Sequence, residues 1–427
     1  MKIRLRGGRL IDPATGTDTI ADLWIDGDRI AAVGRKPAGF GAPARDIDAR
    51  ERVVCPGFIE IGARLREPGA EHKAWIASEL VAAAAGGFTT VCCTPDTSPV
   101  IDTPAVVELI NQRARGVRGA RVRALGALTH GLGGEVLAEM HALKAIGCVG
   151  VTNAGRAIRD TNVLKNALAY ASTLGLTVFL DAEDPWLGAQ GVMHEGARST
   201  RTGLPGIPGA AELIGLARDL VLVAETGARA HFRTLSCAGS VKYIRDARKA
   251  GLAVSADVGI AHLHLTDADV AAHDAACHVR PPLRATRDRD ALRRALARGH
   301  LDMLSAHHEP HDADAKAAPF AASAPGISGL DSFLPLMLEL VDAGAIDLGR
   351  AIAACALAPA RLLDLDSGTL AVGAVADVTV FDPRHDWTLD ATSMRSRGHN
   401  SPFFGQRLRG RVTQTLVGGR LVHDLDA

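Results

Sequence analysis

Residues 56–69 read PGFIEIGARLREPG, and this stretch decides the fold. It begins as an apolar strand and ends in REPG, with Arg64 and Arg66 in its second half. Similar short apolar runs recur along the middle of the chain, near 57–64, 89–95, 122–129, 147–153, 176–182, 228–236, 252–259 and 301–308. Such continuous apolar runs are typical of parallel strands that are covered on both faces.

Helical patterns alternate with these strands. They are expected at 71–86, 104–116, 134–146, 161–174, 209–226, 240–250, 287–298 and 329–343. Eight β–α units in series predict an α/β protein with a (β/α)8 TIM barrel, in which functional residues lie at the C-terminal ends of the strands. An open doubly wound sheet is the alternative, but the unit count and the lack of a G-x-G-x-x-G turn favour the barrel.

The two ends of the chain differ from the middle. Residues 1–54 alternate polar and apolar positions around a Gly27-Asp28 turn, and the C-terminal stretch from about 367 does the same. We therefore expect three parts: 1–54 as the N-terminal part of a β-sandwich, 55–360 as the barrel, and 361–427 as the C-terminal part of the sandwich.

Composition excludes some classes of protein. Lys+Arg and Asp+Glu both number 48, so the formal net charge of zero argues against a nucleic-acid surface. The sequence contains no run of about 18 apolar residues, so no membrane span is expected. The N-terminal segment lacks the apolar core of a signal peptide, so a cytoplasmic protein is expected. The seven cysteines form no C-x-x-C pair and are expected to be buried, reduced thiols.

Several longer segments carry a family resemblance. AAAAGGFTTV, GLPGIPGAAE, RPPLR and the C-terminal RSRGHNSPFFGQRLRGRVTQTLVGGRLV follow REPG in order. Over nearly its whole length the chain resembles the dihydroorotases of the amidohydrolase superfamily, whose first barrel strand reads PGF-(hydrophobic)-D-x-H-x-H-x-R-E-P-G. The resemblance implies a metal-bound hydroxide that hydrolyses or closes a cyclic amide.

Six positions depart from that family pattern. Gly62 and Arg64 stand in place of two metal-binding histidines, and Asn153 in place of a bridging acid or carboxylated lysine. Asp181 and Thr234 stand in place of two further histidines, and His307 in place of an aspartate general base. The resemblance therefore implies no catalytic residue and no metal here. Arg64 is expected to fill the space of the metal and to pair with Asp181, which would otherwise be an unpaired buried carboxylate.

The family's substrate-carboxylate pocket is partly kept. Arg66 and His311 match the family, whereas Asp96 and Arg280 replace asparagines. We interpret these four as a vestigial substrate pocket, with a structural ion pair between Arg66 and Glu67 or a neighbour as the alternative.

A rewired metal site is a further possibility. Its candidate ligands are Asp181, Glu183, Asp184, His231, His262, His264, His307, His308 and His311. If the strand is regular, alternation places His307 and His308 on opposite faces, and His231 is expected to point outward. Cys92 and Cys93 lie inside a strand, where a structural thiol is more typical than a nucleophile.

The chain keeps the segments that define the family's fold but has lost its metal ligands. In this it resembles one kind of family member. This is the non-catalytic dihydroorotase homologue that assembles with aspartate transcarbamoylase, the preceding enzyme of pyrimidine biosynthesis. The resemblance implies a pseudoenzyme: a structural or regulatory subunit with the transcarbamoylase catalytic subunit as partner, homo-oligomer contacts, and no nucleic-acid or membrane partner. The alternative is an active, zinc-dependent cyclic amidohydrolase of the dihydroorotase, hydantoinase or allantoinase type.

Overall fold

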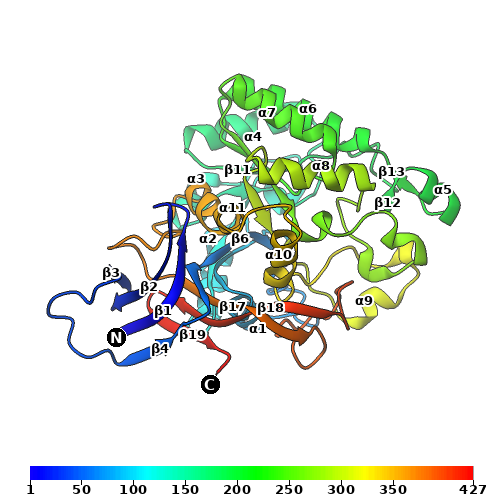
Figure 1. Cartoon of the computed structure of the whole chain (residues 1–427). Helices are drawn as coiled ribbons and strands as arrows, with labels where there is room; N and C mark the ends of the chain where they lie inside the picture. The colour runs from blue at the N-terminus through cyan, green and yellow to red at the C-terminus, as the bar shows by residue number, and fades with distance from the viewer. Residues whose placement is uncertain (427) are drawn as a thin grey trace.

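The computed structural model describes residues 1–426, with the side chains of residues 271 and 272 outside the description. Parallel strands form the predicted (β/α)8 barrel (Figure 1). Each lies within about one residue of its predicted range: β6 (Phe58–Ala63), β7 (Phe88–Cys93), β8 (Arg121–Ala124) continued by β9 (Gly126–Ala127), β10 (Val151–Thr152), β11 (Val178–Asp181), β14 (Ala230–Arg233), β15 (Val254–Gly259) and β16 (Met303–Ser305).

The barrel closes between its last strand and its first. The backbone N–H of Arg64, just after β6, donates to the carbonyl of His308, just after β16, over 3.0 Å. A side chain completes this seam: the N–H of Ala306 donates to Oε2 of Glu60 on β6 over 2.7 Å. Burial raises the pKa of Glu60 to about 7. The seam between β16 and β6 therefore relies on a buried carboxyl group as well as on backbone bonds.

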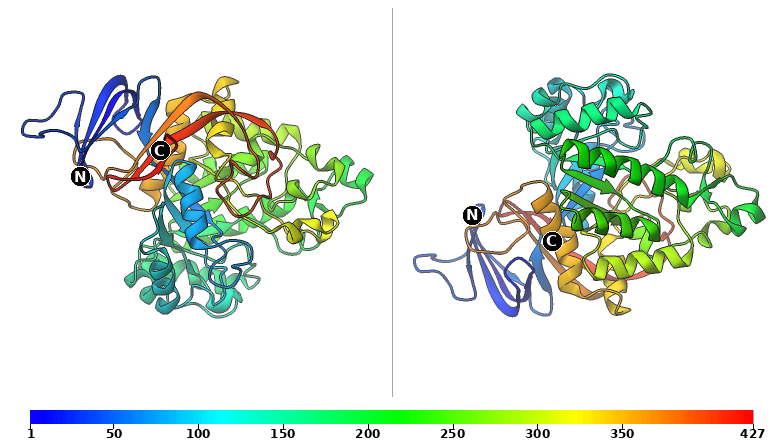
Figure 2. Two further views of the ribbon diagram at one scale, coloured as in Figure 1. Left: turned by 90° about the horizontal axis from the view of Figure 1, so that it is seen from below. Right: turned by 90° about the horizontal axis from the view of Figure 1, so that it is seen from above.

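Helices cover the outside of the barrel, and α4, α6, α7 and α8 pack side by side in chain order (Figure 2). Local signals set their ends: the Asp160 side chain accepts from Asn162 N–H at the start of α4, and Gly227 takes a left-handed conformation after α6. The main helices are α1 (Ile76–Ala85), α2 (Pro104–Ala114), α3 (Met140–Ala145), α4 (Thr161–Thr173), α6 (Gly209–Thr226), α7 (Ala238–Lys249), α8 (Thr286–Ala297) and α10 (Phe333–Asp342). Shorter elements connect them: β12 (Met193–His194), α5 (Ala197–Thr202), β13 (Gly206–Ile207), α9 (Ala313–Ala317), α11 (Leu348–Ile352) and α12 (Ala358–Leu362).

The strands of the two chain ends pair into one sheet, which forms the small β-sandwich. Its order is β19-β18-β17-β5-β1-β2-β3, with β4 beside β1. Apolar residues from both ends, including Ile3, Leu23, Val378 and Leu416, form its buried core. Both termini lie on this side of the molecule (Figures 1 and 2). The strands are β1 (Lys2–Asp12), β2 (Thr17–Asp26), β3 (Arg29–Val33), β4 (Arg45–Asp48), β5 (Val53–Pro56), β17 (Val378–Thr388), β18 (Arg407–Val417) and β19 (Arg420–Asp424).

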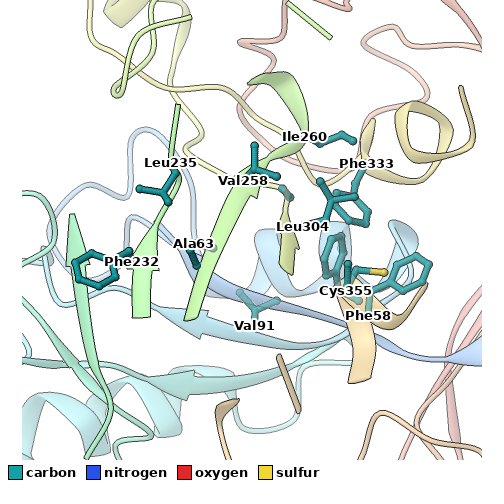
Figure 3. Close-up of a cluster of buried hydrophobic side chains, with 14 of the residues drawn as sticks. Phe58, Ala63, Val91, Phe232, Leu235, Val258, Ile260, Leu304, Phe333 and Cys355 are labelled. Atoms are coloured by element: carbon teal, nitrogen blue, oxygen red, sulfur yellow. The ribbon is translucent and has the colours of Figure 1, made fainter. Parts of the chain in front are cut away.

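An aromatic cluster anchors β6 in the core (Figure 3). The rings of Phe58, Phe88 and Phe333 lie 4.9–5.8 Å apart and are fully buried, so they fix the start of β6 against β7 and α10. The opposite ends of the strands are free to carry polar residues. None of the helices within residues 1–426 combines the length and the apolar character that a membrane span requires.

Candidate functional site

A cavity of about 570 Å³ opens at the C-terminal ends of the barrel strands. Five of the six altered family positions line it, each at or just beyond the end of a strand: Arg64, Asn153, Asp181, Thr234 and His307. The sixth, Gly62, lies two residues before Arg64 on β6. This is the part of a barrel where chemistry is expected.

The space beside Gly62 is filled by Arg233, at the end of β14. A Cβ atom placed on Gly62 would lie 2.6 Å from Nη2 of Arg233, and the same nitrogen donates to the Gly62 carbonyl over 3.3 Å. The Arg233 side chain is only 4% exposed. The missing side chain at position 62 thus makes room for a buried guanidinium, which was not singled out from the sequence.

Asp181 lies next to Arg233 rather than next to Arg64. The two residues are register partners on β11 and β14, and Nη1 of Arg233 is 3.8 Å from Oδ1 of Asp181. The other oxygen of Asp181 accepts from the N–H of Gly155 over 2.8 Å. The predicted Arg64–Asp181 pair is therefore wrong, because the arginine on the neighbouring strand lies closer to this carboxylate.

Arg64 belongs to a different network of charges. Its Nε is 2.7 Å from Oδ2 of Asp96, and its Nη1 is 3.0 Å from Oε2 of Glu309. The other Glu309 oxygen lies 3.2 Å from Nη2 of Arg66. Burial opposes ionisation of Glu309, but Arg64, His311 and then Arg66 together outweigh it and hold the pKa of Glu309 well below its usual range. These four side chains form a fixed, alternating charge network at one wall of the cavity.

The other residues of the predicted substrate pocket are only partly brought together. Arg66 lines the cavity and pairs with Glu309, not with Glu67. Arg280 lines it too, with its Nε 3.0 Å from Oε2 of Glu183. His311 stands outside the lining of this cavity, with Nε2 2.9 Å from Arg66 Nη2.

Asn153 is fixed by hydrogen bonds, and Thr234 and His307 have an unusual backbone conformation. The Asn153 amide accepts from the Thr129 hydroxyl over 2.7 Å and donates to the Arg156 carbonyl over 2.9 Å, so it is engaged on both sides. Thr234 and His307 have left-handed backbones, with φ of 47° and 49°. A β-branched residue in that region is strained by about 1–3 kcal/mol. Burial lowers the pKa of His307 to about 3, so its ring is neutral.

The candidate ligands of a rewired metal site do not converge on one point, and several of them bond different partners. His231 does not point outward as predicted: it shares its strand face with Arg233, and its Nε2 lies 3.1 Å from Asp257. His308 bonds Glu79 over 2.8 Å, whereas His307 lines the cavity; both lie beyond the end of β16, so strand alternation does not apply to them. Among the described residues, no group of three or more His, Cys, Asp or Glu side chains could hold a metal ion. Burial also raises the pKa of the Cys93 thiol to about 12, which leaves it unreactive.

Gly62→Ala is expected to lower the free energy of unfolding by about 1–3 kcal/mol, because the new methyl group meets Arg233 in a packed interior. Denaturant unfolding of the purified protein measures this. Gly196→Ala is the matched control, since a Cβ there meets no atom closer than 4.0 Å. Combining Gly62→Ala with Arg233→Ala should cost less than the sum of the two single changes; strict additivity would contradict the steric explanation.

Comparisons with known proteins agree with the fold. Residues 51–239 match a family described as dihydro-orotase-like. A dihydroorotase-like protein of Pseudomonas aeruginosa is 46% identical over 99% of this chain and 100% of its own length. A dihydroorotase of Anaeromyxobacter dehalogenans is 45% identical over 99% of this chain and 98% of its own. The L-hydantoinase of Arthrobacter aurescens shares the fold, with a TM-score of 0.88 and 24% identity over 100% of this chain and 96% of that one.

Proposed function

This chain belongs to the dihydroorotase-like family of the amidohydrolase superfamily, and on that premise we propose that it is a family member without metal-dependent hydrolysis. The observation that carries this proposal is the Arg233 guanidinium in the space beside Gly62. A divalent metal in the same space would be repelled by a fixed cation, and the repulsion rises as the local dielectric falls.

The donors around Arg233 do not fit the zinc that the family resemblance implies. Zinc sites use several nitrogen, sulfur or carboxylate ligands that converge on one point. Here position 62 has no side chain, and Arg64 is a cation paired with Asp96 and Glu309. The Asn153 amide is already hydrogen-bonded to Thr129 and Arg156. We therefore assign this chain no cofactor and derive no step through a metal.

A barrel of this kind serves best as a scaffold. By its resemblance to the non-catalytic dihydroorotase homologues, the partner is the catalytic subunit of aspartate transcarbamoylase, in a cytoplasmic assembly of the pyrimidine pathway that also contains contacts between copies of this chain. The extensive buried cores of the barrel and of the chain-end sheet supply the rigidity that such a subunit needs. A net charge of zero suits a protein partner rather than a nucleic acid.

The second candidate is an active cyclic amidohydrolase with an altered metal site. It is favoured by the name of the Anaeromyxobacter dehalogenans relative, a dihydroorotase at 45% identity. Affinity isolation of the chain from its host, followed by metal analysis and two activity assays, separates the candidates. Co-purifying transcarbamoylase activity without zinc supports the scaffold. About one zinc per chain, lost with cyclic-amide hydrolysis on chelation, would establish the enzyme.

Gly62→His combined with Arg64→His is expected to give no cyclic-amide hydrolysis, even with added zinc. The pair restores two histidines, but Asn153, Thr234 and Arg233 remain in place, and Arg233 still meets any side chain at position 62. Hydrolysis of dihydroorotate and of a hydantoin, followed by absorbance, measures this. Turnover above that of the zinc-supplemented wild-type protein would show that the remaining positions can still support catalysis.

A further inference from the structure

We infer that the barrel cavity is a binding site for a small, multiply charged oxyanion, held at its floor by Arg233 and at its rim by Arg156 and Arg159. The inference rests on the proposed function in one respect, that no metal shares the cavity with Arg233. It adds a ligand, and with it a means of regulation, to a subunit otherwise assigned only a scaffolding role.

Arg233 is a buried cation with too few partners. A guanidinium has several N–H donors in a planar fork. Within the described part of the chain, one hydrogen bond engages this fork, the 3.3 Å contact from Nη2 to the Gly62 carbonyl. The nearest carboxylate oxygen, on Asp181, is 3.8 Å away, beyond hydrogen-bond range. Arg233 lines the cavity, so an anion there would be within reach of its unused donors and would add charge-assisted hydrogen bonds.

The rest of the cavity wall shows which charges remain available. Seven arginines line it, and four of them are neutralised by carboxylates of the protein: Arg64, Arg66, Arg218 and Arg280. Within the described residues, Arg156 and Arg159 have no such ion pair. Arg159 instead lies over the ring of Trp186 at 4.8 Å, and that ring is 70% exposed. The available cations thus lie at two levels, one buried and two at the rim.

This arrangement fixes the chemical class of the ligand. A planar guanidinium bonds a carboxylate or a phosphate in a two-pronged manner, which a simple halide cannot match. A volume of about 570 Å³ falls in the range of small-molecule sites. Arginines at both levels suit a ligand with two anionic groups, such as a dicarboxylate or a phosphate ester. Asp181 competes for Arg233, so the ligand must displace a weak internal pair.

Calorimetric titration of the purified full-length chain with malonate, and separately with inorganic phosphate, tests the site. Saturable binding of one anion per chain is expected. Arg233→Gln should weaken it at least about tenfold, because a charge-assisted hydrogen bond is lost. Asp181→Asn should tighten it by removing the competing carboxylate. Arg361→Gln, an exposed arginine away from the cavity, should leave it unchanged. Tighter binding of malonate or of phosphate assigns the ligand to dicarboxylates or to phosphates.

Absence of saturable binding by both anions, or equal affinity of wild type and Arg233→Gln, overturns the inference. If Arg233→Gln fails to fold, as judged by circular dichroism, Arg156→Gln combined with Arg159→Gln decides instead: weaker binding supports the site, and unchanged binding overturns it. Zinc analysis of the same preparation keeps the two proposals apart. Bound zinc with hydrolysis would overturn the proposed function, whereas a zinc-free chain that binds neither anion overturns only the anion site.

Discussion

Glu309→Gln is expected to lower the free energy of unfolding by about 3–5 kcal/mol, because it removes one partner from a buried charge network. The Glu309 carboxylate lies 3.0 Å from Arg64 and 3.2 Å from Arg66, and its side chain is 13% exposed. The amide keeps the shape but leaves two guanidiniums short of negative charge. Chemical denaturation of wild type and variant at neutral pH measures the loss.

The same variant predicts a pH dependence. The pKa of Glu309 is lowered in the folded protein: burial is the largest single influence and acts against this, but Arg64, His311 and Arg66 together outweigh it. An unfolded glutamate titrates near about 4.3. The stabilisation is therefore fully present above that pH and is lost as pH falls toward the folded pKa. The gap between wild type and Glu309→Gln should shrink in acid. Glu225→Gln, at an exposed site on α6, should show no gap at any pH, and a gap for Glu309→Gln that persists in strong acid would contradict the assignment.

Glu79→Ala should be about as damaging, with an expected loss of about 3–5 kcal/mol. Glu79 on α1 is fully buried and accepts from His308 Nε2 over 2.8 Å and from the Ser396 hydroxyl over 2.7 Å. The N–H of Gly329 donates to Nδ1 of His308, so Nε2 carries the hydrogen and donates it in the hydrogen bond to Glu79. Alanine leaves these donors without an acceptor in a dry interior, where each unmet group is costly.

Denaturant unfolding against Glu225→Ala measures the effect of Glu79→Ala, since both changes truncate a helical glutamate and only Glu79 is buried. Equal losses would show that the buried network contributes nothing beyond helix propensity. A large loss would show that one carboxylate ties together α1, the residues after β16 and the C-terminal segment near Ser396.

The barrel was predictable because its signals are local. An apolar run followed by a helical pattern identifies each unit, and the topology then places every strand end at one mouth. The five positions that the family resemblance singles out, Arg64, Asn153, Asp181, Thr234 and His307, do line one cavity at that mouth. His307 and His308 do differ in surroundings, but β16 ends at Ser305 and His307 has a left-handed backbone, so alternation along a strand is not the cause.

The pairing of long side chains was not predictable in the same way. Asp181 was assigned to Arg64, although Arg233 on the adjacent strand is its register partner. The residue pattern of one strand does not show which residue of a neighbouring strand will lie beside it. In addition, a long guanidinium side chain can reach several carboxylates. Two signals were available: the charged Arg233 at the end of the buried run AHFR, and Glu309 in HHEPH.

The sheet built from both chain ends affects how the protein is synthesised. The N–H of Leu370 bonds Asp12 across 358 positions of sequence, and β5 pairs with β17. During translation one edge of β5 therefore waits, with its backbone groups unpaired, until nearly the whole chain has left the ribosome. Contacts of such long range form slowly, and an open strand edge is prone to join another chain. A product that stops shortly before β17 would retain every barrel strand and still expose that edge, so premature termination there should yield aggregates rather than a shorter working barrel.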